Sequence, residues 1–226
     1  MTQLFNTDFL TNDTPSESVD LVVTDPPYKI ASGGSTTPKG GVFDKAQNAN
    51  VVSGKLFNNN AIEFSDWLAE IYRVLKNGTH AYIMCNGRNL ACLQTEAEKA
   101  GFVFQNLLVW DKGRLNPNRY YMMQCEFILM LRKGKARTIN NPGMSNLFSV
   151  PNKIGKRLHP TEKPVGLMEI FIQNSSNAGD TVLDPFMGAG STGVASVQLG
   201  RNFIGYEIDE RYFDIARGRI EVNVPQ

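Results

Sequence analysis

The sequence predicts an α/β fold: a doubly wound, mostly parallel sheet with helices on both faces. Apolar runs that suit buried strands alternate with segments whose apolar residues recur every three to four positions, as on one face of a helix. Two of the strand-like runs end in Asp-Pro, and proline cannot continue a sheet ladder. The second of these runs enters a helix through a glycine-rich turn. Ligands of open α/β sheets bind at such strand ends, so both are candidate site segments.

The first half of the chain predicts four strands and two helices around one long loop. Asn77-Gly78 is a typical helix stop. Residues 29–60 are rich in Gly and Asn and lack periodicity, which predicts a mobile loop near the site, with a dispensable disordered loop as the alternative. The expected elements are a short strand closing at Asp8, a strand over 19–24, a helix over 61–76, a strand over 79–85, a helix over 88–100 and a strand over 102–110.

The alternation breaks over about residues 112–157 and then resumes. We expect loops over 112–121 and 138–154, so this stretch reads as a small basic insertion within a single domain that spans residues 1–226. The remaining expected elements are a strand over 126–131, a helix over 164–175, a strand over 181–184, a helix from about 191, a strand over 201–207 and a helix over 209–222.

Charge is unevenly distributed along the chain. The formal net charge is only +1, but the stretch from Lys112 to Lys163 contains eleven Lys and Arg against two acids, Glu126 and Glu162. Asn, Tyr, Met and Pro are interleaved with these basic residues, which favours contact with the phosphates and bases of a nucleic acid. A merely solvated face is the alternative.

The three cysteines, Cys85, Cys92 and Cys125, lie far apart in apolar segments. Their spacing indicates neither a disulfide framework nor a metal site and suits a reducing compartment. No segment is long and apolar enough to span a bilayer, and the first residues do not resemble a signal peptide. We therefore expect a cytoplasmic protein with no metal and no membrane partner.

The glycine-rich turn has the spacing of a nucleotide-binding loop. Gly188, Gly190 and Gly193 match G-x-G-x-x-G, and Glu207 follows at the next predicted strand end. A tight helix–sheet junction would give the same pattern, so the match alone is weak. S-adenosylmethionine (SAM) has a ribose that such an acid can bind, and its cationic groups favour nearby carboxylates. Acids at other predicted strand ends are Asp8, Asp25 and Asp184.

Four stretches together resemble the β-class DNA amino-methyltransferases, which modify adenine N6 or cytosine N4. They are Asp25-Pro-Pro-Tyr28, His159-Pro-Thr-Glu-Lys-Pro164, Leu183-Asp-Pro-Phe-Met-Gly-Ala-Gly190 and Phe203-Ile-Gly-Tyr-Glu207. Their order is also that of the family, with the catalytic motif before the cofactor loop. The resemblance implies a Rossmann-like methyltransferase fold with permuted motif order, and it covers nearly the whole chain except residues 29–60 and 112–155.

The resemblance also implies roles for individual residues. The implied catalytic residues are Asp25, Pro26, Pro27 and Tyr28. The implied SAM-binding residues are Asp8, Thr161, Lys163, Asp184, Phe186, Gly188, Gly190, Ser191, Thr192 and Glu207. Among these, Thr161 and Lys163 would hold the methionine carboxylate and Glu207 the ribose. The basic residues proposed to contact DNA are Lys29, Lys112, Arg114, Arg119, Arg132, Lys133, Lys135 and Arg137; Lys29 stands where the family often has Asn.

These residues predict a chemistry. An exocyclic amine is a poor nucleophile, and it needs acceptors for both hydrogens so that its lone pair faces the methyl group. Asp25 and the Pro26 carbonyl supply such acceptors, Pro27 fixes the turn, and Tyr28 can stack on a base flipped out of the duplex. Direct in-line transfer follows, with proximity supplying much of the acceleration. Asp in the first motif position favours adenine N6, with cytosine N4 as the alternative.

Two other classes of function were weighed against this one. A nicotinamide-dependent oxidoreductase would use the glycine-rich loop but leaves Asp25-Pro-Pro-Tyr28 unexplained. A non-catalytic nucleic-acid-binding module would need no acid at Asp25. The family also implies a possible homodimer and a place in restriction-modification, while the recognition sequence and the preference for duplex or single-stranded DNA stay open.

Overall fold

The computed structural model describes residues 1–27, 62–116, 120–152 and 162–224. The chain divides into two compact units, Met1–Pro26 with Phe64–Gln226, and Pro27–Glu63. The predicted loop over 29–60 falls in the second unit and outside the described residues. Four predicted site residues also lie outside them: Tyr28, Lys29, Arg119 and Thr161. The following description concerns the first unit, and the predicted single domain with its insertion stays a prediction.

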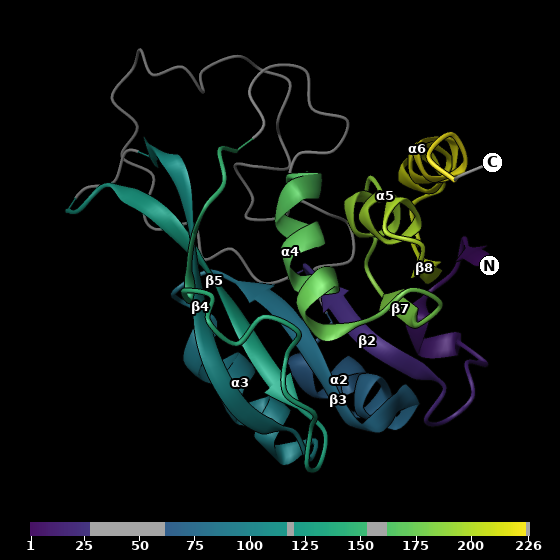
Figure 1. Ribbon diagram of the computed structural model, residues 1–226, viewed down its shortest axis with the longest axis horizontal. Helices are drawn as coiled ribbons and strands as arrows, with labels where there is room; N and C mark the ends of the chain where they lie inside the picture. Colours follow the sequence, from purple (N-terminus) through teal and green to yellow (C-terminus); the bar gives the residue numbers. More distant parts are fainter. Residues whose placement is uncertain (28–61, 117–119, 153–161, 225–226) are drawn as a thin grey trace. The chain divides into compact units, whose positions relative to one another are not determined.

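One eight-stranded sheet organises this unit (Figure 1). Its order is β1-β8-β7-β2-β3-β5-β4-β6, and all neighbours are parallel except β5, which is antiparallel to both β3 and β4. The strands are β1 (Thr2–Phe5), β2 (Val19–Thr24), β3 (Leu75–Cys85), β4 (Val103–Asn116), β5 (Met123–Arg132), β6 (Leu147–Ser149), β7 (Thr181–Asp184) and β8 (Asn202–Tyr206). We call the edge where the parallel strands end the carboxyl edge, and the opposite one the amino edge.

Helices cover both faces of the sheet (Figure 1). On one face lie α2 (Phe64–Val74) and α3 (Leu90–Lys99), and on the other α4 (Val165–Ser175), α5 (Ser191–Gln198) and α6 (Glu210–Glu221). A short 3-10 helix, η1 (Phe9–Thr11), follows β1. None of the described helices is long and apolar enough to cross a membrane. The predicted doubly wound α/β fold is confirmed.

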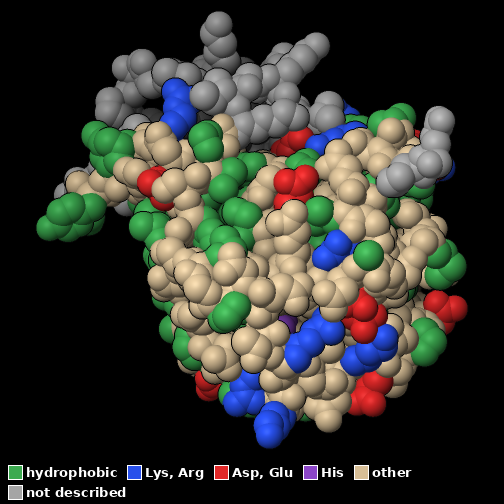
Figure 2. Space-filling view, viewed as in Figure 1, with side chains coloured by type: hydrophobic (Ala, Val, Ile, Leu, Met, Phe, Trp, Pro, Cys, Tyr) green, Lys and Arg blue, Asp and Glu red, His purple; other side chains and the backbone are tan. Residues whose placement is uncertain are grey.

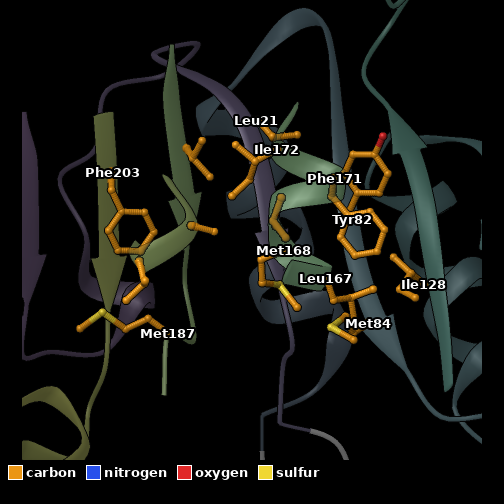
Figure 3. Close-up of a cluster of buried hydrophobic side chains, with 14 of the residues drawn as sticks. Leu21, Tyr82, Met84, Ile128, Leu167, Met168, Phe171, Ile172, Met187 and Phe203 are labelled. Atoms are coloured by element: carbon orange, nitrogen blue, oxygen red, sulfur yellow. The ribbon is translucent and has the colours of Figure 1, made fainter. Parts of the chain in front are cut away.

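A buried hydrophobic cluster lies between the sheet and the helices α4, α5 and α6 (Figure 3). Successive strand residues point to opposite faces, so Leu21 of β2 and Tyr82 of β3 meet α4, where Phe171 stacks on Tyr82 with ring centroids 4.9 Å apart. The Tyr82 hydroxyl shares a 2.7 Å hydrogen bond with Ser175 Oγ, which satisfies both polar groups inside the core. This packing fixes α4, and therefore the segment that precedes it, against the centre of the sheet.

The strand order reverses between β7 and β2. The next strand after β7 along the chain, β8, lies on one side, whereas the next strand after β2, β3, lies on the other. Leu21 pairs with Val182, so the two strands run side by side to the carboxyl edge. Ligands of doubly wound sheets bind at such a switch point, and here Asp25 and Asp184 lie at the two strand ends.

Two boundaries differ from the sequence prediction because distant residues pair there. The expected loop over 112–121 is in part strand: β4 continues to Asn116, which pairs with Met123 at the start of β5. The stretch 138–154, expected to be irregular, contains β6, which pairs with β4. Such non-local pairing leaves no periodic signal in a short polar segment.

The predicted helix stop at Asn77-Gly78 is also in a different place. Helix α2 ends at Val74, and Asn77 and Gly78 already belong to β3. Gly78 adopts a φ of 85°, and its N–H donates to the Lys133 carbonyl at 2.9 Å. The glycine therefore serves an irregular strand start, where positive φ is needed, and not a helix cap.

Candidate active site

Asp25 directly follows β2, and its two carboxylate oxygens have different environments. Oδ2 accepts a hydrogen bond from Lys163 Nζ. Oδ1 is buried and has no hydrogen-bond partner among the residues that the structure describes. The following prolines, Pro26 and Pro27, carry no N–H, so they cannot supply one. A buried carboxylate oxygen without a donor is costly, which marks this atom as a place for a ligand.

An alternating row of charges runs from Asp25 along the carboxyl edge. Lys163 Nζ lies 3.8 Å from Glu126 Oε2, and Lys112 Nζ lies 3.2 Å from Glu126 Oε1. The side chains are 19% exposed at Asp25, 10% at Lys163, 23% at Glu126 and 7% at Lys112. Two acids and two cations thus compensate each other where water is scarce, as buried charges require.

The surroundings of Asp25 favour its protonated form on balance. Burial raises the pKa of its carboxyl group, the Lys163 ammonium lowers it, and the Glu126 carboxylate raises it again. The neighbouring Cys85 thiol, at the end of β3, has its pKa raised to about 12, first by burial and then by Asp25 and Glu126. Both shifts have the same origin, because negative charge is concentrated at a poorly hydrated strand edge.

Asp184 ends β7 beside Asp25 and is almost completely buried. Its Oδ1 accepts from Thr24 Oγ1 at 2.7 Å and from the Phe186 N–H at 3.1 Å. Burial raises the pKa of this carboxyl group to about 6, although these hydrogen bonds work against the increase. Thr24 thereby links the two Asp-Pro turns directly.

The glycine-rich loop is tied to the acid that was predicted to serve it. The Gly188 N–H donates to Glu207 Oε2 at 2.9 Å, and the Asp209 N–H donates to Glu207 Oε1 at 2.9 Å. Gly190 begins α5 with a φ of 78°, a conformation that favours glycine. A Cβ at Gly193 would lie 2.4 Å from Ile220 Cδ1, so this glycine permits the close packing of α5 on α6. The fold therefore holds the predicted nucleotide-type loop in a defined conformation.

The segment before α4 is attached to the same loop. The Lys163 carbonyl accepts a 2.8 Å hydrogen bond from Ser191 Oγ at the start of α5. The preceding Glu162, whose side chain is 1% exposed, pairs with Arg219 of α6 at 3.2 Å. Arg219 also donates to the Ala189 carbonyl. Lys163 thus stands between the glycine-rich loop, through its backbone, and Asp25, through its side chain.

The other predicted cofactor residues lie along the carboxyl edge. Phe186 packs edge-on against Trp67 of α2, with ring centroids 5.5 Å apart. Thr192 Oγ1 is 3.4 Å from the Val23 carbonyl, which joins α5 to β2. Asp8 follows the outer strand β1 and accepts from the Leu10 N–H at 2.9 Å, capping η1. The carboxyl edge therefore collects acids from the ends of four strands, β1, β8, β7 and β2.

Those basic residues of the predicted DNA-contact set that the structure describes do not form one surface. Lys112 is buried in the charge row, and Arg114 is exposed near the end of β4. Lys133 lies at the amino edge, where its buried ammonium donates to the Tyr72 and Leu75 carbonyls at 2.8 and 2.7 Å.

The remaining described members of the predicted DNA-contact set, Arg132, Lys135 and Arg137, also lie at the amino edge. Arg132 donates to Gln105 Oε1 at 3.1 Å, and Arg137 donates to the Ser175 carbonyl at 2.9 Å. Lys135 is exposed near them. In Figure 2, Lys and Arg side chains with acidic ones among them gather in the lower half of the view. Burial and backbone pairing remove Lys133 from any DNA contact surface, and the other three lie far from Asp25.

Glu126 is the residue of this site that sequence reasoning missed. It is one of only two acids in the basic stretch from Lys112 to Lys163. Glu126 pairs with Lys112 and Lys163, and Glu162 pairs with Arg219. An acid isolated in a basic stretch was therefore the sequence signal that could have identified Glu126.

Among the described residues, no group of three or more His, Cys, Asp and Glu side chains could hold a metal ion.

Comparison with known proteins places this geometry in a family. A family model described as DNA methylase, for N6 and N4 methyltransferases, matches residues 19–218. Type II methyltransferase M2.DpnII of Streptococcus pneumoniae is 34% identical over 91% of this chain and 83% of its own length. DNA adenine methyltransferase YhdJ of Escherichia coli is 31% identical over 92% and 78%, respectively.

Solved structures agree with the sequence relatives. The M1.HpyAVI–SAM complex superposes with a TM-score of 0.71 at 28% identity, over 97% of this chain and all of that one. The match of the family model to most of the sequence gives the identity: the chain belongs to the N6/N4 DNA methyltransferase family.

Proposed function

We propose that this protein transfers the methyl group of SAM to the exocyclic N6 of adenine in DNA. The observation that carries the proposal is Asp25 Oδ1, a buried acceptor without a partner in the described part of the chain, at the switch point of the sheet. An amine hydrogen is the kind of donor that this atom lacks. The relatives named as DNA methyltransferases support the same reaction.

The residues present fit SAM as the cofactor. Glu207 accepts backbone N–H groups at both carboxylate oxygens, and a carboxylate has lone pairs left for the ribose hydroxyls. The acids at the carboxyl edge suit a ligand with two cationic groups, whereas a dinucleotide pyrophosphate would meet negative charge there. When bound, SAM supplies an electrophilic methyl group on a sulfonium. We propose the cofactor residues predicted from the sequence as its binding set, apart from Lys163, whose ammonium is engaged by Asp25.

Asp25 and Pro26 would prepare the target amine. Asp25 Oδ1 accepts one amine hydrogen and the Pro26 carbonyl accepts the other, which directs the nitrogen lone pair away from both. The carboxyl group must be ionised for this task, because a protonated carboxyl can present a donor instead of an acceptor. Lys163 therefore matters for the reaction, since its ammonium lowers the Asp25 pKa against the effect of burial.

Access to the amine requires the base to leave the helix stack, because the target nitrogen is out of reach within a duplex. Tyr28, which lies outside the described residues, stays the predicted stacking partner. Exposed basic residues near the carboxyl edge, such as Arg114, are the proposed phosphate contacts. The target-recognition role of about residues 112–157 belongs to the same proposal.

Adenine is preferred over cytosine as the target. Asp stands in the first position of the catalytic motif, which by family resemblance favours adenine N6. One relative, YhdJ, is named a DNA adenine methyltransferase. Cytosine N4 has the same amine geometry and is the alternative product. A homodimer, a cytoplasmic location and a partner restriction enzyme stay predictions.

The test is an identification of the product. The protein is incubated with labelled SAM and unmethylated DNA, duplex or single-stranded, and the digested nucleosides are identified by mass. N6-methyladenine is the expected result. N4-methylcytosine would overturn the target base and keep the reaction. SAM binding without any methylated base would overturn DNA as the substrate, and a thermal shift with NAD but not SAM would favour the oxidoreductase.

A further inference from the structure

We propose that Glu126 and Lys163 act as a pair of positioning residues for Asp25, so that Glu126 contributes to methyl transfer without touching cofactor or substrate. The inference rests on the proposed function and deepens it by assigning Glu126, which has no role in the sequence analysis. It also gives Lys163 a task other than the one that family resemblance predicts for it. Its basis is the charge row from Asp25 through Lys163 and Glu126 to Lys112.

The first step is the unequal use of the two Asp25 oxygens. Lys163 Nζ engages Oδ2, while Oδ1 stays buried and lacks a partner among the described residues. A carboxylate rotates about its last bond with little resistance unless one oxygen is held. The Lys163 contact therefore selects which oxygen faces the target amine, and holding that oxygen in place pre-organises the acceptor.

The second step is that Glu126 holds the Lys163 ammonium from the other side. A lysine side chain is flexible, and one ion pair does not fix it. Glu126 extends from β5, where it pairs with Trp110 of β4 just beyond the last residue that pairs with β3, so its position is set by the sheet. Lys112 engages the other Glu126 oxygen at 3.2 Å. Each charge in the row is thus held by its neighbours.

The third step is that the Lys163 backbone is fixed as well. Its carbonyl accepts from Ser191 Oγ at 2.8 Å, at the start of the helix that follows the glycine-rich loop. The side chain therefore spans a set distance between that loop and Asp25. A lysine that only neutralised an acid would not need a second attachment through its backbone. The attachment at both ends therefore favours a role for Lys163 in positioning Asp25.

The two roles of Lys163 make different predictions. If its ammonium held the methionine carboxylate, its loss would weaken SAM binding and leave turnover at saturating SAM nearly intact. If it positions Asp25, its loss lowers kcat and leaves the dissociation constant of SAM nearly unchanged. The Glu126 variant separates the two roles of Lys163 further. Glu126 would not itself bind the methionine carboxylate, because both groups are negatively charged.

The experiment compares Glu126→Gln and Lys163→Met with wild type and with Glu70→Gln. Glu70 is a matched control, since it is a partly buried acid that pairs with Arg73 on α2, outside the site. Methyl transfer from labelled SAM to DNA gives kcat at saturating SAM and DNA from pH 5 to 9, and calorimetry gives SAM affinity. We expect kcat to fall about tenfold or more in both site variants, the size of a misplaced catalytic group. SAM affinity should stay within about twofold, and Glu70→Gln should match wild type in both quantities.

The pH profile supplies a readout that a purely structural role would not move. The ionisable groups facing Asp25 are Lys163, Glu126, Cys85 and Asp184. Because Glu126 raises the Asp25 pKa, Glu126→Gln should move the acidic limb of the kcat profile to lower pH. Lys163→Met should move it to higher pH, because the ammonium lowers that pKa.

The outcomes separate this inference from the proposed function. If wild type methylates DNA but Glu126→Gln keeps wild-type kcat and pH profile, the positioning role is wrong while the function stands. If Lys163→Met weakens SAM binding and leaves kcat intact, Lys163 serves the cofactor and the pair is overturned. If wild type methylates no DNA base, the proposed function itself fails. If the acidic limb of the kcat profile moved equally and in the same direction in both site variants, the proposed pair would also be contradicted.

Discussion

Two lysines of nearly equal burial lie at opposite edges of the sheet and bind different kinds of partner. The Lys163 side chain is 10% exposed at the carboxyl edge and pairs with the carboxylates of Asp25 and Glu126. The Lys133 side chain is 9% exposed at the amino edge, and besides Glu17 it binds two backbone carbonyls near the end of α2. Both came from the same basic stretch of the sequence, so local charge alone does not reveal which lysine belongs to the site.

The difference lies in what each edge leaves unsatisfied. At the amino edge, cations end on helix-terminal carbonyls: Arg137 on Ser175 and Arg201 on Ser176, at 2.9 and 2.7 Å. Such contacts neutralise the negative end of a helix and complete its hydrogen bonding. At the carboxyl edge, charges pair with charges, and Asp25 Oδ1 has no donor within the described ranges. Toward the amino edge, His80 Nδ1 is also buried without a partner among the described residues, but it is an uncharged ring nitrogen, because burial lowers the pKa of His80 to about 4. The carboxyl edge is thus incomplete at a charged acceptor, where a substrate can be bound. The cations of the amino edge are completed by carbonyls and acids, and they stabilise the fold.

The largest expected effect is at Asp25. Asp25→Asn keeps the shape and removes the charge that the amine hydrogen needs, so turnover should fall about 100- to 1,000-fold, as for the loss of one transition-state hydrogen bond. SAM binding should persist, since Asp184 and Glu207 keep their bonds to the backbone. Rates with labelled SAM and calorimetry measure the two quantities. Wild-type turnover in this variant would show that the incomplete edge is not the site of reaction.

Lys133→Met tests the completed edge. The change removes the donor to the Tyr72 and Leu75 carbonyls, and the free energy of unfolding should fall by about 2–4 kcal/mol, the cost of leaving buried polar groups without partners. Turnover per folded molecule should not change. Urea unfolding measures the first quantity and methyl transfer at low temperature the second.

Lys163→Met supplies the reciprocal comparison. Its turnover should fall, and its loss of stability should be smaller than that of Lys133→Met. Glu126 keeps Lys112 as a partner after the change, and Asp25, whose pKa burial already raises, can take up a proton. If both variants lost stability alone, the contrast between the two edges would not hold.

Asp184 should leave a signature in the pH dependence of stability. Its pKa is raised to about 6 in the folded protein from an ordinary value of 3.8, so the folded state binds more protons between these values. Stability therefore decreases as pH rises through this window, by about 2–3 kcal/mol for a shift of this size. The loss is complete above pH 6.

Asp184→Asn should remove this dependence while its side-chain oxygen still accepts from Thr24 and Phe186. The measurement is urea unfolding of both proteins at pH 4 and pH 7. Relative to wild type, the variant should gain stability on going from pH 4 to pH 7. A constant difference between the two proteins would show that Asp184 ionises normally and that its burial costs little.

Long apolar strands and the spacing of motifs were readable from the sequence. Val19–Thr24 and Thr181–Asp184 were predicted at their observed bounds, because buried parallel strands are continuous apolar runs bounded by Asp-Pro. The adjacency of Asp25 and Asp184 also followed, since parallel strand ends share one edge. The extension of β4 to Asn116 did not follow, because it depends on pairing with Met123 across a polar hairpin.

The site was predicted in part for a similar reason. Glycines and terminal acids reveal themselves by spacing, and Gly188 does bind Glu207. Spacing does not reveal the partners of buried cations, because the sequence alone does not distinguish Lys133, Lys112 and Lys163. Only the antiparallel pairing of β5 turns Glu126 to the carboxyl edge and Lys133 to the amino edge. The roles of individual residues stay predictions that the variants above test.

The smallest expected effect concerns DNA affinity and contrasts Arg114 with Lys135. Both side chains are exposed and belong to the same basic stretch, but Arg114 lies near the end of β4 and Lys135 follows β5 at the amino edge. If DNA meets the carboxyl edge, Arg114→Ala removes one phosphate contact. The salt slope of binding should then decrease by about 0.9, and affinity should fall a few-fold at low salt.

Lys135→Ala is the matched control for that measurement, because it removes the same charge from the other edge. Its DNA affinity and salt slope should equal those of wild type when binding is followed by fluorescence anisotropy between 50 and 200 mM salt. Equal losses in both variants would mean that DNA contacts the basic stretch without regard to edge. A loss in Lys135→Ala alone would move the proposed DNA surface to the amino edge, and the reaction would then need DNA that reaches around the sheet to Asp25.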